Sequence, residues 1–121
     1  MDDNSTTLAD LKQLVKEFRD LRDWKQFHNP KDLATAISIE SAELLENFLW
    51  KNAGEVEAIM EDSSKMEKIE DELADILLFC LSFAETVGID LSTAIDRKLA
   101  KNAAKYPTEK ARGTAKKYTE L

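Results

Sequence analysis

The sequence predicts an all-α protein in which four long helices form a bundle. Apolar residues recur three or four positions apart along most of the chain, which is the spacing of a helix face. The 121 residues include only 3 glycines and 2 prolines, and all five stand where a helical pattern starts or stops. No segment shows the alternation typical of a strand. We therefore expect one domain, residues 1–121, with a basic C-terminal arm at about 107–121.

The first two helices are expected at about residues 7–23 and 30–50. The first follows a run of capping residues and keeps leucine, valine and phenylalanine at helical spacing. Residues 24–28 interrupt that pattern. Asn29 followed by Pro30 is a favourable N-cap and first-turn pair, so the second helix should begin there.

A short helical segment at about residues 55–61 precedes the third long helix. Residues 64–67, Ser-Lys-Met-Glu, form a capping box, which predicts that the third helix begins at this point. Gly88 suits the position just past its C-terminal end, because glycine tolerates the left-handed conformation found there.

The fourth helix is expected to begin after Asp90 or Ser92, both of which are good N-cap residues. It should end near Tyr106, because Pro107 disfavours a helical conformation in the residue before it. The residues that follow are polar and basic, as expected for an exposed arm.

Composition indicates a soluble, cytoplasmic protein with no membrane partner. Hydrophobic residues make up 43% and charged residues 34% of the chain, which is typical of globular proteins. No apolar run approaches the roughly 18 residues that span a bilayer, and the N-terminus lacks the basic start of a signal peptide. The lone Cys80 cannot form an internal disulfide.

The charge is distributed unevenly around a net value of -7. Residues 1–96 carry 9 Lys and Arg against 22 Asp and Glu, whereas residues 97–121 carry 8 against 2. An acidic body argues against nucleic-acid binding, which requires a broad basic face. An acidic centre with a basic C-terminal end instead suits metal ions and phosphates.

Several carboxylates fall on the apolar side of the two central helices. At 100° per residue, Glu40 lies within the apolar stripe of the second helix, with Glu43 at its border and Glu46 further round. Glu72 and Asp75 occupy the matching shoulder of the third helix. Solvated surface acids are one interpretation. Unpaired carboxylates in apolar faces are costly, however, and their presence on two helices suggests a common cause.

That common cause is predicted to be a divalent cation. The motifs Glu40-x-x-Glu43 and Glu72-x-x-Asp75 would bring four oxygen donors together on facing helices, and Mg²⁺ or Mn²⁺ prefers such ligands. A ferritin-like di-iron site requires Glu-x-x-His pairs, and the only histidine, His28, does not follow a glutamate at that spacing.

Two other groups of side chains are candidates for substrate contacts. Lys98, Asn102 and Lys105 share one face of the fourth helix, where they either form a solvated stripe or hold phosphates. Trp24 and Trp50 flank the second helix, where aromatic rings either cover the core or stack on a nucleobase. Because the chain has no glycine-rich phosphate loop and no Ser-His-Asp or Cys-His order, we expect no covalent nucleophile.

Taken in this order, the motifs resemble the all-α NTP pyrophosphatases related to MazG. The motifs concerned are Glu40-x-x-Glu43, Glu72-x-x-Asp75, and the later group Lys98, Asn102, Lys105, Tyr106 and Pro107. The stretches RDWKQFHNP, SIESAELLENFLW and KKYTEL are similar, more narrowly, to the dCTP pyrophosphatases. The similarity covers about residues 8–121.

The resemblance implies Mg²⁺-dependent hydrolysis of deoxynucleoside triphosphates, preferably dCTP-like, to the monophosphate and pyrophosphate. Such an enzyme would remove unwanted nucleotides from the cellular pool. The resemblance also implies a homo-oligomer, dimer or tetramer, with sites between subunits and Mg²⁺ on the four carboxylates. It assigns the base to Trp24, His28 and Trp50, and the phosphates or sugar to Lys98, Asn102, Lys105 and Tyr106.

In this reaction a water molecule attacks the α-phosphorus in line, and a carboxylate accepts its proton. The candidates for that base are Glu43 and Glu46. Two alternatives remain open: a non-catalytic helical interaction or regulatory module, and a relative that acts on another phosphorylated nucleotide. The second and third helices are apolar around much of their circumference, which independently predicts a homo-oligomer.

Overall fold

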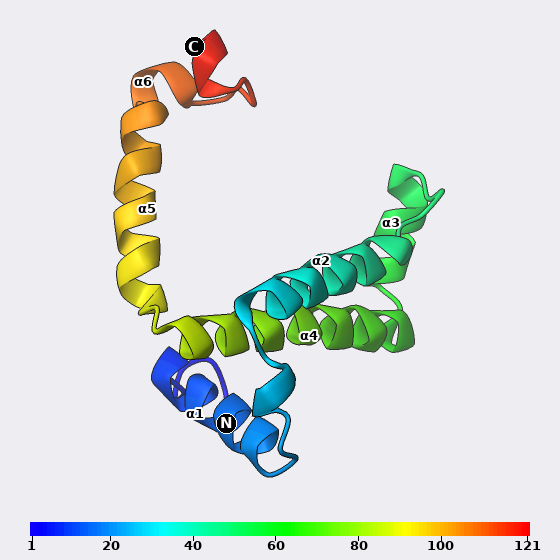
Figure 1. The fold of residues 1–121 in the computed structure, drawn as a ribbon. Helices are drawn as coiled ribbons and strands as arrows, with labels where there is room; N and C mark the ends of the chain where they lie inside the picture. Colours follow the sequence, from blue (N-terminus) through cyan, green and yellow to red (C-terminus); the bar gives the residue numbers. More distant parts are fainter. The chain divides into compact units, whose positions relative to one another are not determined.

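The computed structural model describes residues 1–121 and confirms the all-α class (Figure 1). The chain divides into two compact units, Met1–Gly88 and Ile89–Leu121. No single helix is both long and apolar enough to cross a membrane, and the helices Ser63–Val87 and Leu91–Lys105 pass that test only as a bent pair. The elements are α1 (Leu8–Asp20), η1 (Lys25–Phe27), α2 (Pro30–Glu46), α3 (Ala53–Met60), α4 (Ser63–Val87), α5 (Leu91–Lys105), α6 (Thr108–Ala111) and η2 (Tyr118–Glu120), where η is a 3-10 helix.

Side-chain caps determine where the first two long helices begin. The Thr7 hydroxyl accepts from the Asp10 backbone N–H at 3.1 Å, and the Asp10 carboxylate accepts from the Thr7 N–H at 2.9 Å, which completes a capping box. Asn29 accepts from the Asp32 N–H at 2.9 Å, with Pro30 in the first turn of α2. The predicted starts of these helices are confirmed to within one residue.

The N-cap of α4 differs from the sequence prediction. Asp62, rather than Ser64, caps the helix, and its Oδ1 accepts from the backbone N–H groups of Ser64 and Lys65 at 3.0 and 3.1 Å. A carboxylate here satisfies two otherwise unpaired donors and interacts favourably with the helix dipole. At the other end Gly88 adopts φ +73°, so the predicted glycine cap is confirmed.

Helices α1 and α2 end earlier than their apolar patterns predicted. Asp20 rather than residue 23 ends α1, because Asp23 turns left-handed at φ +54°. Glu46 rather than residue 50 ends α2, because Asn47 donates its side-chain N–H to the Glu43 carbonyl at 3.2 Å and competes with continued helix. Trp50 then adopts φ +61°.

The first unit is built around α4, which packs against α1, α2 and α3 (Figure 1). Its most buried apolar side chains are Leu33 of α2, Ile59 of α3, and Leu81 and Ala84 of α4. The pairing of α2 with α4 is the most extensive of these contacts, and it brings the two predicted carboxylate motifs onto adjoining helices.

The second unit contains α5, α6 and η2, so the predicted arm has short helical elements of its own. Tyr118 from the last of these lies edge-on to Tyr106, with ring centroids 6.0 Å apart. The Lys105 ammonium lies 4.8 Å from the centroid of the Tyr118 ring, within cation–π range. These contacts return the C-terminal segment to the end of α5.

Candidate functional site

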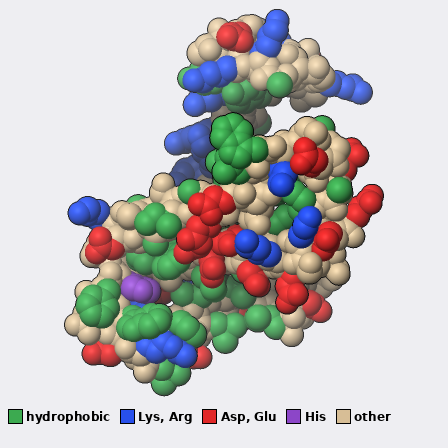
Figure 2. All heavy atoms as spheres, turned by 90° about the vertical axis from the view of Figure 1, so that its right-hand side faces the viewer, with side chains coloured by type: hydrophobic (Ala, Val, Ile, Leu, Met, Phe, Trp, Pro, Cys, Tyr) green, Lys and Arg blue, Asp and Glu red, His purple; other side chains and the backbone are tan.

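Three carboxylates converge where α2 lies against α4. Glu40 and Glu43 are one turn apart on α2, Glu72 lies on α4, and one oxygen from each is within 4.8 Å of the others. All three side chains are half-buried. Acidic side chains gather in the middle of the face shown in Figure 2, with hydrophobic side chains to their left and below and basic side chains to their right.

The electrostatics of this acidic cluster show mutual repulsion. Burial raises the pKa of Glu40, and the hydrogen bond and negative charge of Glu43 raise it further, followed by the charges of Asp75 and Glu72. Burial, then the charge and hydrogen bond of Glu43, raise the pKa of Glu72 as well. The opposing effect of Lys68 on Glu72 is the smallest contribution. At Glu72 the neighbouring acids therefore outweigh the one lysine that opposes them.

The donor set fits a hard divalent cation. The Oε2 atom of Glu40 is buried and has no hydrogen-bond partner. An unpartnered buried carboxylate oxygen is costly, and a bound cation would satisfy it. Asp75, half-buried one turn after Glu72, supplies the fourth oxygen donor predicted from the sequence.

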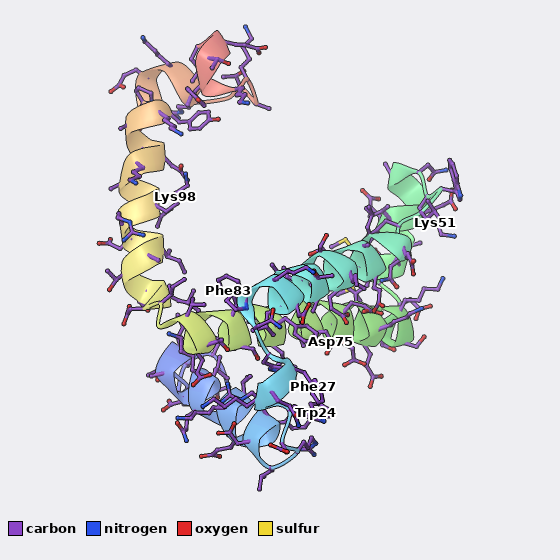
Figure 3. The ribbon with its side chains drawn as sticks, in the orientation of Figure 1. Trp24, Phe27, Lys51, Asp75, Phe83 and Lys98 are labelled. Carbon is purple, nitrogen blue, oxygen red and sulfur yellow. The ribbon has the colours of Figure 1, made fainter.

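A pocket of about 510 Å³ adjoins the acidic cluster. Its wall is mostly apolar and is built from α1, the segment between α1 and α2, and α4. Asp75 lines this pocket and also acts on Glu40, so the two features share a side chain. Figure 3 labels Asp75 on α4 and Trp24 in the segment between α1 and α2, both of which belong to the first unit. Its other lining residues include Phe18, Arg19, Trp24, His28, Phe79 and Ser82.

Aromatic side chains form one wall of the pocket. Phe18 and Trp24 meet edge to face, with centroids 5.9 Å apart, and Trp24 is 43% exposed. His28 is half-buried beside them, and its Nδ1 atom is buried without a partner. Burial lowers the pKa of His28 and the charge of Arg19 lowers it further, so the imidazole is neutral at pH 7. A mostly apolar pocket with a neutral imidazole can accommodate an aromatic heterocycle and donate to or accept from its edge.

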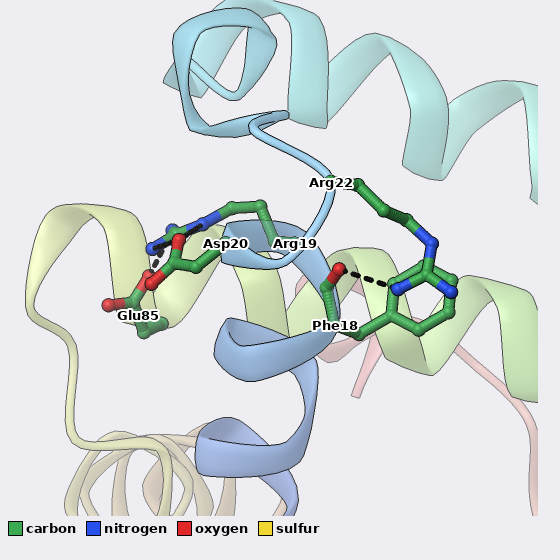
Figure 4. A network of polar contacts seen from close by, with 5 residues as sticks. All are labelled: Phe18, Arg19, Asp20, Arg22 and Glu85. Atoms are coloured by element: carbon green, nitrogen blue, oxygen red, sulfur yellow. Dashed lines mark hydrogen bonds and ion pairs between the residues drawn. The ribbon is translucent and has the colours of Figure 1, made fainter.

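A buried arginine connects the pocket wall to α4. Arg19 is only 3% exposed, and its guanidinium pairs with Asp20 at 2.8 Å and with Glu85 of α4 at 2.6 Å (Figure 4). Neither Arg19 nor the pocket-lining Phe18 was predicted as a site residue from the sequence. The signal for Arg19 was a charged residue within the apolar repeat of its helix, but its partner lies 66 positions away along the chain.

The remaining predicted residues lie elsewhere. Glu46 is exposed at the last position of α2, outside the three-carboxylate cluster. Trp50 is 91% exposed beyond α2, and it does not line the pocket that holds Trp24 and His28. Four others belong to the second unit, where Asn102 is half-buried and the remainder are exposed: Lys98, Asn102, Lys105 and Tyr106.

Several known proteins are similar to this chain in sequence, and one of known structure is similar in fold. Residues 35–121 match the family described as MazG-like. The dCTP pyrophosphatase 1 of Homo sapiens is 37% identical over 115 residues, which cover 95% of this chain and 68% of the human protein. Those of Rattus norvegicus and Bos taurus are 36% and 37% identical over the same length. A crystal structure of a pyrophosphatase from Archaeoglobus fulgidus matches with a TM-score of 0.78 at 37% identity, covering 88% of this chain and 98% of that one.

Proposed function

The chain belongs to the MazG-like family as a nucleoside triphosphate pyrophosphatase, and we propose that it hydrolyses deoxynucleoside triphosphates with Mg²⁺, dCTP preferentially. The observation that carries this proposal is the shared position of Asp75, which lines the pocket and acts on the carboxylates. A base in the pocket would therefore place its phosphates toward the acidic cluster. The similarity to the dCTP pyrophosphatases supports cytosine as the preferred base.

Four side chains would hold the cation: Glu40, Glu43, Glu72 and Asp75. Their oxygens suit Mg²⁺, or Mn²⁺, and the unpartnered Glu40 oxygen supports a ligand role. When bound, the cation would offset the charge of the triphosphate and polarise its α-phosphorus. These carboxylates would be held together before substrate arrives, because α2 packs against α4.

The aromatic pocket would bind the base. Trp24 offers a ring face for stacking, and the neutral His28 offers a nitrogen to the edge of the base. Trp50, which the sequence also assigned to the base, lies outside this pocket, so within one chain Trp24 and His28 are the residues placed to contact the base. The phosphates and sugar are assigned to Lys98, Asn102, Lys105 and Tyr106.

Hydrolysis breaks the bond between the α-phosphorus and the bridging oxygen. The oxygen of a water molecule forms a bond to the α-phosphorus while a carboxylate accepts a proton from that water, and pyrophosphate leaves with the bridging oxygen. Glu43 and Glu46 are the candidate bases. Glu46 is exposed and outside the acidic cluster, so its carboxylate would not bind the cation and would remain available to accept a proton. Comparing Glu46→Gln with Glu43→Gln in single turnovers distinguishes the two.

The experiment that tests the function is a substrate panel. The purified protein is incubated with dCTP, dATP, dTTP and dGTP, each with Mg²⁺ or with chelator, and pyrophosphate is measured. We expect pyrophosphate to be released in the presence of Mg²⁺ but not of chelator, and kcat/KM to be highest for dCTP. Release from another phosphorylated nucleotide would redirect the substrate assignment. No release from any nucleotide would favour a non-catalytic helical module.

A further inference from the structure

The pocket's aromatic wall is too exposed to be held by burial alone. Phe18 is 53% exposed and Trp24 43% exposed, although both line the pocket. Their rings meet at 70°, with centroids 5.9 Å apart. An edge-to-face pair of this kind contributes modestly. Any further restriction of these two side chains therefore has to come from other contacts.

The guanidinium of Arg22 lies close to both aromatic rings. Its guanidinium carbon lies 3.6 Å from the centroid of the Phe18 ring and 6.0 Å from that of Trp24, within the range of cation–π attraction. Its Nη1 also donates to the Phe18 backbone carbonyl at 3.0 Å (Figure 4). The planar guanidinium thus stacks on the ring of Phe18 and is fixed by a hydrogen bond to the same residue.

The backbone between these residues is already fixed by the turn that ends α1. Asp23 adopts φ +54°, and the Trp24 N–H donates to the Arg19 carbonyl at 3.1 Å. The Gln26 side chain donates to the Asp23 carbonyl at 3.0 Å. Since the main chain is held in this way, the freedom that remains is in the side-chain torsions of Trp24 and Phe18.

We propose that Arg22 is a positioning residue that holds Phe18, and through it the Trp24 ring, in the orientation that receives the base. The proposal rests on the assignment of the pocket to the base. Arg22 contacts the aromatic wall rather than the acidic cluster, so it acts on substrate affinity and not on the chemical step.

The test compares kinetics of matched variants with dCTP and Mg²⁺. Arg22→Met keeps an unbranched side chain but removes the charge and the hydrogen-bond donors, whereas Arg22→Lys keeps a charge and donors but lacks the planar guanidinium. Lys31→Met is the control, because Lys31 is an exposed cation in the first turn of α2. We expect Arg22→Met to raise KM about two- to fivefold at unchanged kcat. Arg22→Lys should be intermediate, Lys31→Met neutral, and Trp24→Ala more severe, at about five- to 150-fold.

A second measurement reports on the Trp24 ring without substrate. Acrylamide quenching of tryptophan fluorescence is measured in a Trp50→Phe background, so that Trp24 is the only emitter. Arg22→Met should increase the quenching constant, and Lys31→Met should not. If Arg22→Met folds poorly, Arg22→Lys carries both measurements with smaller shifts.

The outcomes separate this inference from the proposed function. Unchanged KM and unchanged quenching in an active enzyme would overturn the role of Arg22. A lower melting temperature with unchanged KM would reduce Arg22 to a structural residue and also overturn it. If the unmodified protein releases no pyrophosphate from any nucleotide, the proposed function fails, and the quenching data still decide whether Arg22 orients Trp24.

Discussion

At the scale of single residues, the protein retains charged groups in places that cost stability. Glu40 and Glu72 have raised pKa values, chiefly from burial, with repulsion from neighbouring acids adding to it. Arg19 is buried, but it is compensated by Asp20 and Glu85. The two sites differ in charge compensation: the arginine is paired within the chain, whereas the acids raise one another's pKa.

Glu72→Gln should abolish hydrolysis and leave the metal-free protein equally or more stable. Because the pKa of Glu72 is raised in the folded state, its charge opposes folding, and removing that charge relieves repulsion. The rise in melting temperature caused by Mg²⁺ should shrink in the variant, since binding to the folded state alone stabilises it by mass action. Melting curves with Mg²⁺ and with chelator measure both effects.

Glu70→Gln serves as the control, because Glu70 is an exposed acid on the same helix. It should retain activity and the full response to Mg²⁺.

For the metal-free unmodified protein, stability should increase as pH falls through the raised pKa of Glu72 toward 4.5, since the folded state takes up the proton first. A metal-free protein destabilised by Glu72→Gln would instead identify a structural ion pair.

The folded protein should lose stability on mild acidification, because His28 must then be protonated. Its pKa is lowered from 6.5 by burial and then by Arg19, so the unfolded chain binds the proton first. The contribution of the neutral imidazole is complete above 6.5 and declines as pH falls from there to the lower folded-state pKa. His28 is the only histidine, so its proton NMR signal can be followed directly. A midpoint near 6.5 in both folded and urea-unfolded protein would contradict this.

At the scale of secondary-structure elements, caps and glycines determine the ends of the helices. Gly88 ends α4 at φ +73°, where a Cβ would be strained although no atom lies within 4 Å of it. Gly54 lies inside α3 without such a φ, and a Cβ there would be 3.5 Å from the Asn52 side chain, an ordinary contact. The same substitution therefore has opposite consequences at the two positions.

Gly88→Ala should destabilise the protein by about 1–2 kcal/mol, because L-residues disfavour the left-handed conformation. Gly54→Ala should stabilise it by about 0.4–1 kcal/mol, because alanine lowers the entropy of the unfolded chain at no steric cost. Chemical denaturation of the two variants beside the unmodified protein measures the difference. Equal effects would show that the backbone at Gly88 relaxes out of its left-handed conformation.

At the scale of the whole molecule, a single chain buries few apolar side chains. Only four fall in the core, whereas large apolar residues stay exposed along α2 and after it, among them Ile39, Leu45, Leu49 and Trp50. Soluble monomers seldom expose large apolar patches of this kind. This distribution supports the homo-oligomer expected from the sequence.

We expect light scattering at micromolar concentration to give a mass of at least twice 13.7 kDa. Leu45→Lys, which introduces a charge at a 67% exposed leucine of α2, should shift the protein toward smaller species. Gln13→Lys adds the same charge at an exposed polar position of α1 and should leave the mass unchanged. A mass near that of one chain for the unmodified protein would refute the oligomer.

The sequence by itself determined the helical class, most helix starts and the carboxylate motifs. These features depend on local signals, such as the caps at Thr7 and Asn29, the left-handed glycine at Gly88, and the periodicity that puts Glu40 on an apolar face. Local signals can be read from neighbouring residues, because their energies arise within one or two turns.

Only the tertiary structure decided the composition of the pocket and the ends of α1 and α2. Phe18 belongs to the apolar repeat of the first helix, yet it lines the pocket, because the turn at Asp23 brings Trp24 back against it. Arg19 became a buried connection only when α4 placed Glu85 beside it, 66 positions along the chain. Contacts between distant segments determine burial and charge compensation, and no short sequence window contains both partners.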